Sequence, residues 1–192
     1  MRVISGSAKG IKLAEFKGDS IRPTADRVRE AVFSSLNSQF NGFVGKKVLE
    51  LFAGTGAMSI EALSRGAAKA VMIDESRDAE ELIKRNLATA GVSDRALFKR
   101  GNVHEILSRL AVDGPFDLII LDPPYAKNNI ETIITDLIHF GLVQSDGIIC
   151  IETSSKTVLD DTIGNMISFN RRKYGSTLIS YYRFSEAEAG LS

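Results

Sequence analysis

The chain of 192 residues carries 24 lysines and arginines against 24 aspartates and glutamates, and 44% of its residues are hydrophobic. This composition is typical of a globular domain with a full core, and the zero net charge excludes a general attraction to nucleic acid. No apolar run approaches the ~20 residues that a membrane helix needs. The single cysteine excludes a disulfide framework and a cysteine-based metal cage. Without the apolar stretch of a secretory leader, the expected compartment is the cytoplasm.

Residues 1–45 do not follow the pattern of the rest of the chain, and we interpret them as a basic N-terminal extension. Short strands are predicted at 2–5 and 11–14, and a helix over about 25–38 has its apolar residues on one face. Thr24, which directly follows a proline, is a suitable N-cap for this helix. Arg27 and Arg29 are expected on the helix face that points away from the core.

Charge is unevenly distributed along the chain. Residues 1–29 hold seven bases against three acids, a local balance of +4. A second basic cluster lies at residues 171–173. These patches could guide a polyanion to one face of a neutral body, or they could be ordinary solvated surface.

From residue 47 onward, short apolar runs alternate with helical patterns, and we interpret residues 46–186 as the main domain. The runs are apolar without alternation, as in strands that are covered on both faces. Alternating strands and helices predict an α/β, doubly wound fold with a mostly parallel sheet. The predicted strands are 47–52, 69–74, 96–100, 116–121 and 147–152, and the predicted helices lie near 57–65, 77–90, 103–111 and 129–140.

Two more strands, at 166–172 and 177–184, bring the predicted total to seven. Only Gly175 marks a turn between them, and no helical pattern separates them. They are therefore predicted to pair as an antiparallel hairpin at one edge of the sheet.

A glycine turn, Gly54-Thr55-Gly56, lies where the first core strand gives way to the first helix. Glycine lets the backbone approach a ligand closely, and a helix N-terminus offers unpaired N–H groups. A nicotinamide or flavin site would need a third small residue, glycine or alanine, three positions after Gly56. That position is Ser59, so the match to a pyrophosphate cradle is incomplete.

Two acids near this turn indicate an adenosine ligand that carries a positive charge. Asp74 closes the second strand, 20 residues after Gly54, where an acid can accept both hydroxyls of a ribose. Glu50 would repel a pyrophosphate, but it suits an amino or sulfonium group, and S-adenosylmethionine has both. The alternative is that the glycines are plain turn residues and that Asp74 caps a helix. Asn102 after the third strand could bind the adenine edge or cap the next helix.

The most specific motif is Asp122-Pro123-Pro124-Tyr125, which follows the apolar strand at 116–121. Ligands of open parallel sheets collect at the carboxyl ends of the strands. An exocyclic base amine is a poor nucleophile, and acceptors such as the Asp122 carboxylate and the Pro123 carbonyl can free its lone pair for attack. The prolines stiffen the loop, and Tyr125 offers a face on which an unstacked base can lie. The alternative is a bare turn with an aromatic plug.

We predict structural roles for the remaining candidate nucleophiles and metal-binding residues. Cys150 lies in an apolar run and is predicted to be a core residue. His104 and His139 have no partnering acid at metal-ligand spacing, so we expect no metal site.

At these motifs the chain resembles the RsmD family of class I S-adenosylmethionine-dependent methyltransferases, which act on guanine N2 in small-subunit rRNA. The resemblance covers nearly the whole chain. The segment Arg22-Pro23-Thr24, followed by Asp26-Arg27-Val28-Arg29-Glu30-Ala31, narrows it to this family. It departs from the family at two positions: Asp74 stands where Glu is common, and Asn102 where Asp is common.

The resemblance implies a Rossmann-like methyltransferase fold and methyl transfer to the exocyclic N2 of one guanine in 16S rRNA, of the guanine(966) type. The substrate would be the small ribosomal subunit or its assembly intermediate, and we expect a monomer without membrane contact. The implied residues are Glu50, Phe52, Gly54, Gly56, Asp74 and Asn102 for the cofactor, Asp122, Pro123 and Tyr125 for catalysis, and Lys9, Lys12, Arg22, Arg27 and Arg29 for RNA.

Three alternatives remain open at the level of sequence. An adenine-N6 methyltransferase of DNA or RNA would use the same motif at 122–125, although 192 residues leave little room for a sequence-reading domain. A non-catalytic RNA binder would be expected to lose Asp122 or the glycines, and neither is lost. A nicotinamide oxidoreductase is disfavoured by Ser59 and Glu50.

Overall fold

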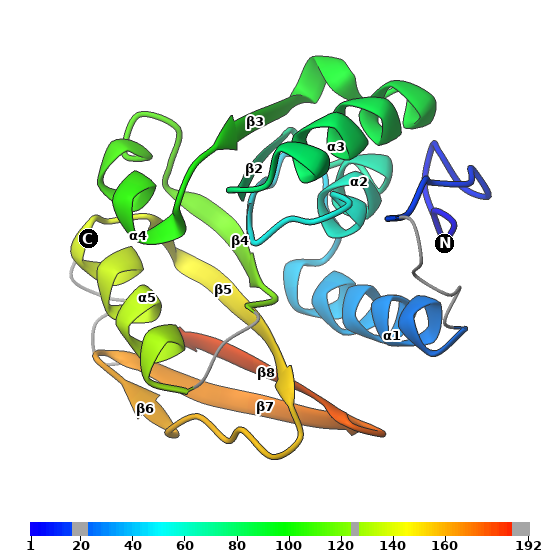
Figure 1. Ribbon diagram of the computed structural model, residues 1–192. Coiled ribbons are helices and arrows are strands. Elements are labelled where there is room, and N and C mark those ends of the chain that lie inside the picture. The colour runs from blue at the N-terminus through cyan, green and yellow to red at the C-terminus, as the bar shows by residue number, and fades with distance from the viewer. Residues whose placement is uncertain (17–22, 124–126, 186–192) are drawn as a thin grey trace. The chain divides into compact units, whose positions relative to one another are not determined.

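The computed structural model describes residues 1–16, 23–123 and 127–185 (Figure 1). The chain divides into two compact units, Met1–Asn102 and Val103–Ser192. Each unit is an α/β structure with its own strands. The division at residues 45 and 46 that we drew from the sequence concerns function and stays a prediction.

The first unit is built on three parallel strands in the order β3-β2-β1. Leu49 pairs with Val71 and Val71 with Leu97 along this ladder, and β1 and β2 are buried over most of their length. Apolar residues on both faces explain why these runs show no alternation. The elements are β1 (Lys47–Leu51), α2 (Ala57–Ser64), β2 (Lys69–Asp74), α3 (Arg77–Ala90) and β3 (Ala96–Arg100).

The helix α1 (Pro23–Phe40) precedes this sheet and begins two residues earlier than predicted. Proline is favoured at the first helical position because its missing N–H would have no partner there. The N-cap prediction for Thr24 is therefore wrong, since Thr24 lies inside the first turn. Val28, Val32 and Leu36 are buried, as the predicted apolar face requires.

The first sixteen residues form a narrow loop in place of the two predicted strands. Only one isolated antiparallel bridge, Arg2 to Lys12, joins its two sides within the described residues. The Gly10 N–H also donates to the Val3 carbonyl at 2.8 Å. The loop is attached to α2, where the buried Glu61 carboxylate accepts hydrogen bonds from the backbone of Ile4 and Ser5.

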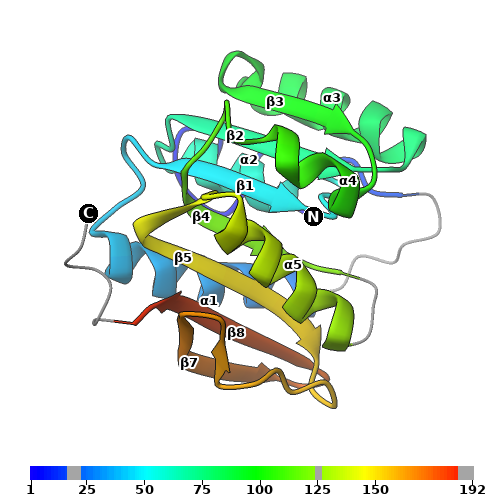
Figure 2. The ribbon, with the colours of Figure 1, turned by 90° about the vertical axis from the view of Figure 1, so that its left-hand side faces the viewer.

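The second unit joins parallel and antiparallel strands in the order β4-β5-β8-β7-β6. β4 and β5 are parallel, and Leu121 pairs with Ile151 at their carboxyl ends. β5 and β8 are antiparallel, as are β7 and β8. The helix α5 lies against β4 and β5 (Figure 2). The elements are α4 (Val103–Ile106), β4 (Phe116–Leu121), α5 (Lys127–His139), β5 (Val143–Ser154), β6 (Thr162–Ile163), β7 (Met166–Tyr174) and β8 (Thr177–Phe184).

The hairpin at the end of the chain is confirmed, with Gly175 in its turn at a φ of 60°. Three details of this unit differ from prediction. The helix expected at 103–111 is a four-residue α-helix followed by a 3₁₀ turn, Leu107–Arg109. β5 starts at Val143 because that residue already pairs with Phe116, across a register shift in β4. The described residues contain eight strands instead of seven, because β6 has only two residues and no pattern of its own.

No helix in the described part of the chain is long and apolar enough to cross a membrane. Cys150 is fully buried in β5, as predicted, and burial raises the pKa of its thiol. The described residues contain no group of three or more potential metal ligands.

Candidate functional site

The glycine turn of the first unit has an unusual backbone. Phe52, Gly54 and Gly56 all have positive φ angles, of 60°, 53° and 72°. The conformation suits glycine, but it strains an aromatic residue by about 1–3 kcal/mol. Two hydrogen bonds from this turn to β2 hold it in place: the Ala53 N–H donates to the Ile73 carbonyl at 3.0 Å, and the Gly54 N–H donates to Asp74. Strained backbone of this kind is concentrated at ligand sites.

Glu50 occupies the N-terminal end of α2. Its carboxylate is 5% exposed and accepts a hydrogen bond from the Ser59 N–H at 2.8 Å. A helix N-terminus favours one negative group, which here is already supplied by the protein. A pyrophosphate at the same place would face this carboxylate at close range. The position of Glu50 at this helix end thus strengthens the argument from the sequence against a nicotinamide site.

Asp74 joins the glycine turn to the end of β2. Its Oδ2 accepts from the Gly54 N–H at 2.8 Å, and its Oδ1 accepts from the Ser76 N–H at 2.9 Å. The N-cap of α3 is Ser76, whose side chain accepts from the Ala79 N–H. Asp74 is therefore not the capping residue of that helix. An ionised carboxylate has about four acceptor sites, and the hydrogen bonds from Gly54 and Ser76 occupy two of them.

Asn102 follows β3 and directly precedes α4, so its position fits both of its predicted roles. Its side-chain amide points to the Glu75 carboxylate at 3.5 Å, which is a weak contact. Both residues are exposed.

The second unit places Asp122 and Pro123 directly after β4, where the sequence predicted them. Pro123 is buried and Asp122 is exposed, but protein atoms crowd the Asp122 carboxyl group enough that desolvation raises its pKa. Tyr125 and Pro124 lie outside the described residues.

Glu152 on β5 is a neighbour of Asp122 that the sequence interpretation missed. Leu121 pairs with Ile151, so the residues that follow them come side by side. Burial first, and then the negative charge of Asp122, raise the pKa of Glu152 to about 7, against the effect of a hydrogen bond with Thr177. The sequence does show that Glu152, like Asp122, directly follows an apolar run. Only the parallel register of β4 and β5 shows that the two acids are neighbours.

The basic residues predicted to contact RNA do not all share one environment. Lys9, Lys12 and Arg27 are exposed, as a surface for a polyanion requires. Arg22 lies outside the described residues.

Arg29 is only 6% exposed, so the prediction that it faces away from the core is wrong. Its guanidinium pairs with Asp26 at 3.0 Å and donates a hydrogen bond to the Arg2 carbonyl. This hydrogen bond connects the start of the N-terminal loop to α1. The helical pattern could not show this, because Arg2 is far away in the sequence.

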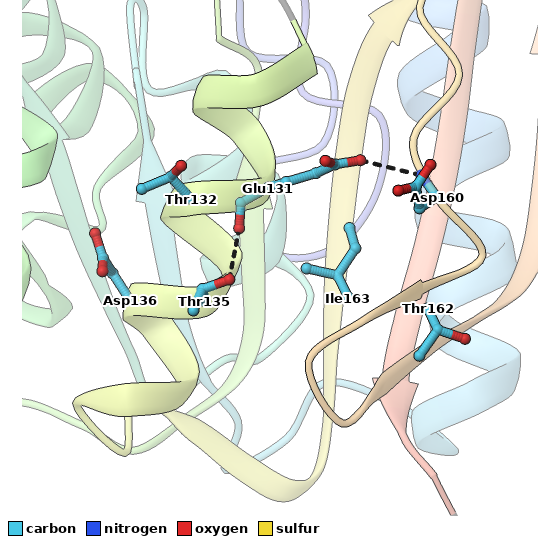
Figure 3. Close-up of a pocket in the computed structure, with 7 residues that line it drawn as sticks. All are labelled: Glu131, Thr132, Thr135, Asp136, Asp160, Thr162 and Ile163. Carbon is cyan, nitrogen blue, oxygen red and sulfur yellow. Dashed lines mark hydrogen bonds between the residues drawn. The ribbon is translucent and has the colours of Figure 1, made fainter.

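A pocket of about 390 Å³ lies elsewhere in the second unit, between α5 and the segment that contains β6 (Figure 3). Three acids, Glu131, Asp136 and Asp160, line it together with three threonines and Ile163. Glu131 accepts a hydrogen bond from the Asp160 N–H at 3.1 Å, as the dashed line in Figure 3 shows. Such an acidic lining repels a polyanion, so this pocket has no part in the predicted RNA surface.

Comparison with known proteins finds relatives that match nearly the whole chain. A family model described as "Conserved hypothetical protein 95" matches residues 1–183. The protein YlbH of Bacillus subtilis is 35% identical over 184 residues, covering 95% of this chain and 98% of YlbH. The Ribosomal RNA small subunit methyltransferase D of Escherichia coli is 32% identical over 194 residues, covering 98% of this chain and 91% of that protein.

Solved structures show the same fold over nearly the whole length. The yhhF methyltransferase from Escherichia coli superposes with a TM-score of 0.81 at 30% identity, covering 96% of this chain and 98% of that one. A hypothetical protein of Thermus thermophilus, TTHA0928, superposes with a TM-score of 0.78 at 26% identity, covering 95% and 99%. The fold is the Rossmann-like methyltransferase fold with antiparallel strands at its C-terminal end, and the chain belongs to the RsmD family of methyltransferases.

Proposed function

We propose that this protein transfers a methyl group from S-adenosylmethionine to the exocyclic N2 of a guanine in 16S rRNA. The small ribosomal subunit or an assembly intermediate is the substrate. The observation that carries this proposal is the match to Ribosomal RNA small subunit methyltransferase D over 98% of the chain. The glycine turn of the first unit and Asp122 at the end of β4 in the second unit support it, because the proposed chemistry needs a cofactor turn and an acceptor for the amine.

The first unit binds the cofactor. The Asp74 carboxylate accepts the ribose hydroxyls with the acceptor sites that Gly54 and Ser76 leave open. Glu50 provides negative charge for the amino and sulfonium groups of the ligand. Phe52, Gly54 and Gly56 bring the backbone close to the ligand, and Asn102 meets the adenine edge.

S-adenosylmethionine supplies an electrophilic methyl group on a sulfonium centre. The Asp122 carboxylate and the Pro123 carbonyl accept hydrogen bonds from the guanine amine, so that its lone pair is free for attack. Proline at positions 123 and 124 lacks an N–H and stiffens the loop, which fixes the acceptors in place. Stacking of the base on Tyr125 contributes about 1–3 kcal/mol. As the new N–C bond forms, the bond between the methyl carbon and sulfur breaks and leaves S-adenosylhomocysteine, and the methylated amine then loses one proton to water.

The test is methylation of small subunits from a strain that lacks its own enzyme of this type, followed by mass analysis of the nucleosides. The expected product is N2-methylguanosine at a single position. Asp122→Ala is expected to lower kcat about 100-fold or more, the usual effect of removing a well-placed polar group from such a site. Asp146→Ala, which removes an exposed acid at the start of β5, is the matched control.

N6-methyladenosine as the product would establish the adenine-N6 alternative in place of this proposal. Full activity of Asp122→Ala would refute the role of that carboxylate. Calorimetric titration that shows binding of NAD but not of S-adenosylmethionine would favour the oxidoreductase alternative and contradict the cofactor assignment.

A further inference from the structure

We propose that Phe16 forms one wall of the S-adenosylmethionine site and that Asn86 is the residue that positions it. The inference rests on the proposed cofactor site at the glycine turn. It concerns a segment of the N-terminal loop that no motif of the chain singles out.

The two glycines of the turn face different surroundings. A Cβ placed on Gly56 would lie 3.2 Å from Ile83 and 3.3 Å from Met72, so that side of the turn is packed against the core of the unit. A Cβ placed on Gly54 would have one neighbour within 4 Å among the described residues outside its own chain neighbours, Phe16 Cε2 at 3.9 Å. Gly54 therefore borders open space, and the Phe16 ring bounds that space.

Asn86 fastens the Phe16 segment to the same turn. Its side chain is fully buried in α3. Its Oδ1 accepts from the Ala14 N–H at 2.7 Å, and its Nδ2 donates to the Ala14 carbonyl at 3.1 Å and to the Thr55 carbonyl at 3.0 Å. One amide thus connects the residue two before Phe16 with the residue after Gly54. A buried polar group with this number of partners holds a segment in a single arrangement.

An apolar ring is useful at this position because the proposed ligand carries a sulfonium charge, whose attraction to a carboxylate is weakened by water. A ring at the turn excludes water from the ligand, which strengthens the attraction between the ligand and the Glu50 carboxylate.

A tryptophan at position 16 provides a direct test, because the chain contains no tryptophan. Titration of Phe16→Trp with S-adenosylhomocysteine is expected to change the tryptophan emission, with a midpoint equal to the Kd from calorimetry. Phe140→Trp, at a partly exposed phenylalanine of the second unit, is the matched control and is expected to show no change. Unchanged tryptophan emission of a Phe16→Trp variant that still binds S-adenosylhomocysteine by calorimetry would overturn the inference.

The effect of removing the Phe16 side chain on the Kd is the second measurement. Phe16→Ala is expected to raise the Kd for S-adenosylhomocysteine about tenfold, with a Tm close to that of the wild type, because Phe16 is only partly buried. Phe140→Ala is expected to leave the Kd unchanged. Asn86→Asp keeps the acceptor for the Ala14 N–H but loses both donated hydrogen bonds, so it is expected to raise the Kd as Phe16→Ala does.

The outcomes separate this inference from the proposed function. A Kd of Phe16→Ala within twofold of the wild type would overturn the wall assignment and leave the cofactor site in place. Absence of S-adenosylhomocysteine binding by the wild type would overturn the cofactor assignment, and this inference with it.

Discussion

The residues Asp122 and Glu152 show how two side chains on neighbouring strands change each other's chemistry. Each is an ordinary acid in the sequence, but the register of β4 and β5 brings them side by side. Removal from water and mutual repulsion disfavour the charged forms. The consequence at this scale is a dependence of stability on pH, which arises first from the burial of Glu152 and is increased by the charge of Asp122.

Glu152→Gln tests this dependence. The folded-state pKa of Glu152 is raised from 4.5 to about 7, so the folded protein binds a proton more tightly than the unfolded chain between these values. The stabilisation is fully present below about pH 4.5 and is lost as the pH rises through about 7. Relative to the glutamine variant, the free energy of unfolding of the wild type is expected to fall by about 1–2 kcal/mol between pH 5 and pH 8, after allowance for the partial exposure of Glu152.

Urea unfolding of both proteins across this range measures the difference. Glu105→Gln, at an exposed acid of the same unit, is the control. Parallel pH curves for the wild type and Glu152→Gln would contradict the assignment of the raised pKa to this residue.

At the scale of elements, the N-terminal loop is held by hydrogen bonds to α2 and not by a sheet. Glu61 accepts from the backbone of Ile4 and Ser5, and the Ser64 hydroxyl accepts from the Ala8 N–H at 2.9 Å. The Ser7 N–H donates to the Ser64 carbonyl at 2.8 Å. Two consecutive turns of one helix thus fix the loop that carries Lys9 and Lys12.

Two glycines of this loop provide a matched pair of variants. Gly6 and Gly10 both have a φ of 84°, so alanine is strained by about 1 kcal/mol at either position. A Cβ on Gly6 would also stand 1.9 Å from the Ser64 carbonyl oxygen, whereas a Cβ on Gly10 meets nothing within 4 Å. Gly6→Ala is therefore expected to lower the free energy of unfolding by about 2–4 kcal/mol, and Gly10→Ala is expected to lower it by about 1 kcal/mol. Equal losses in thermal unfolding of the two variants would show that the loop is not docked on α2.

At the scale of the whole molecule, the proposed function requires a protein with a formal net charge of zero to bind a polyanion. The proposed function therefore assigns the backbone contacts of the RNA to a local set of bases. Of the predicted set, Lys9, Lys12 and Arg27 are exposed, and Arg29 is committed to Asp26 and Arg2.

Salt dependence tests this assignment. Replacing Lys9, Lys12 and Arg27 together by alanine is expected to weaken small-subunit binding at low salt and to lower the slope of log K against log[salt] by about 2–3. Arg77→Ala, at a base that is 81% exposed on α3, is expected to leave the slope unchanged. Filter binding at several salt concentrations measures both. An unchanged slope for the triple variant would place the RNA on another surface.

Local pattern was enough to predict most of the elements and the places of several candidate site residues in them. β2, β3, β4, β8 and α3 have the predicted bounds, because buried apolar runs, caps and turn glycines act within a few residues of each other. Asp74 and Asp122 lie at strand ends and Gly54 and Gly56 lie between β1 and α2, as the sequence predicted, and their roles in binding and catalysis stay predictions.

Tertiary contacts decided the features that join distant residues. The burial of Arg29, the pairing that starts β5 at Val143, and the neighbours Asp122 and Glu152 all depend on segments that no periodicity relates. The three hydrogen bonds of Asn86 belong to the same class, since they connect residues 31 and 72 positions apart. A hydrophobic pattern states which face of an element is buried, but only the packed chain states which partner covers it.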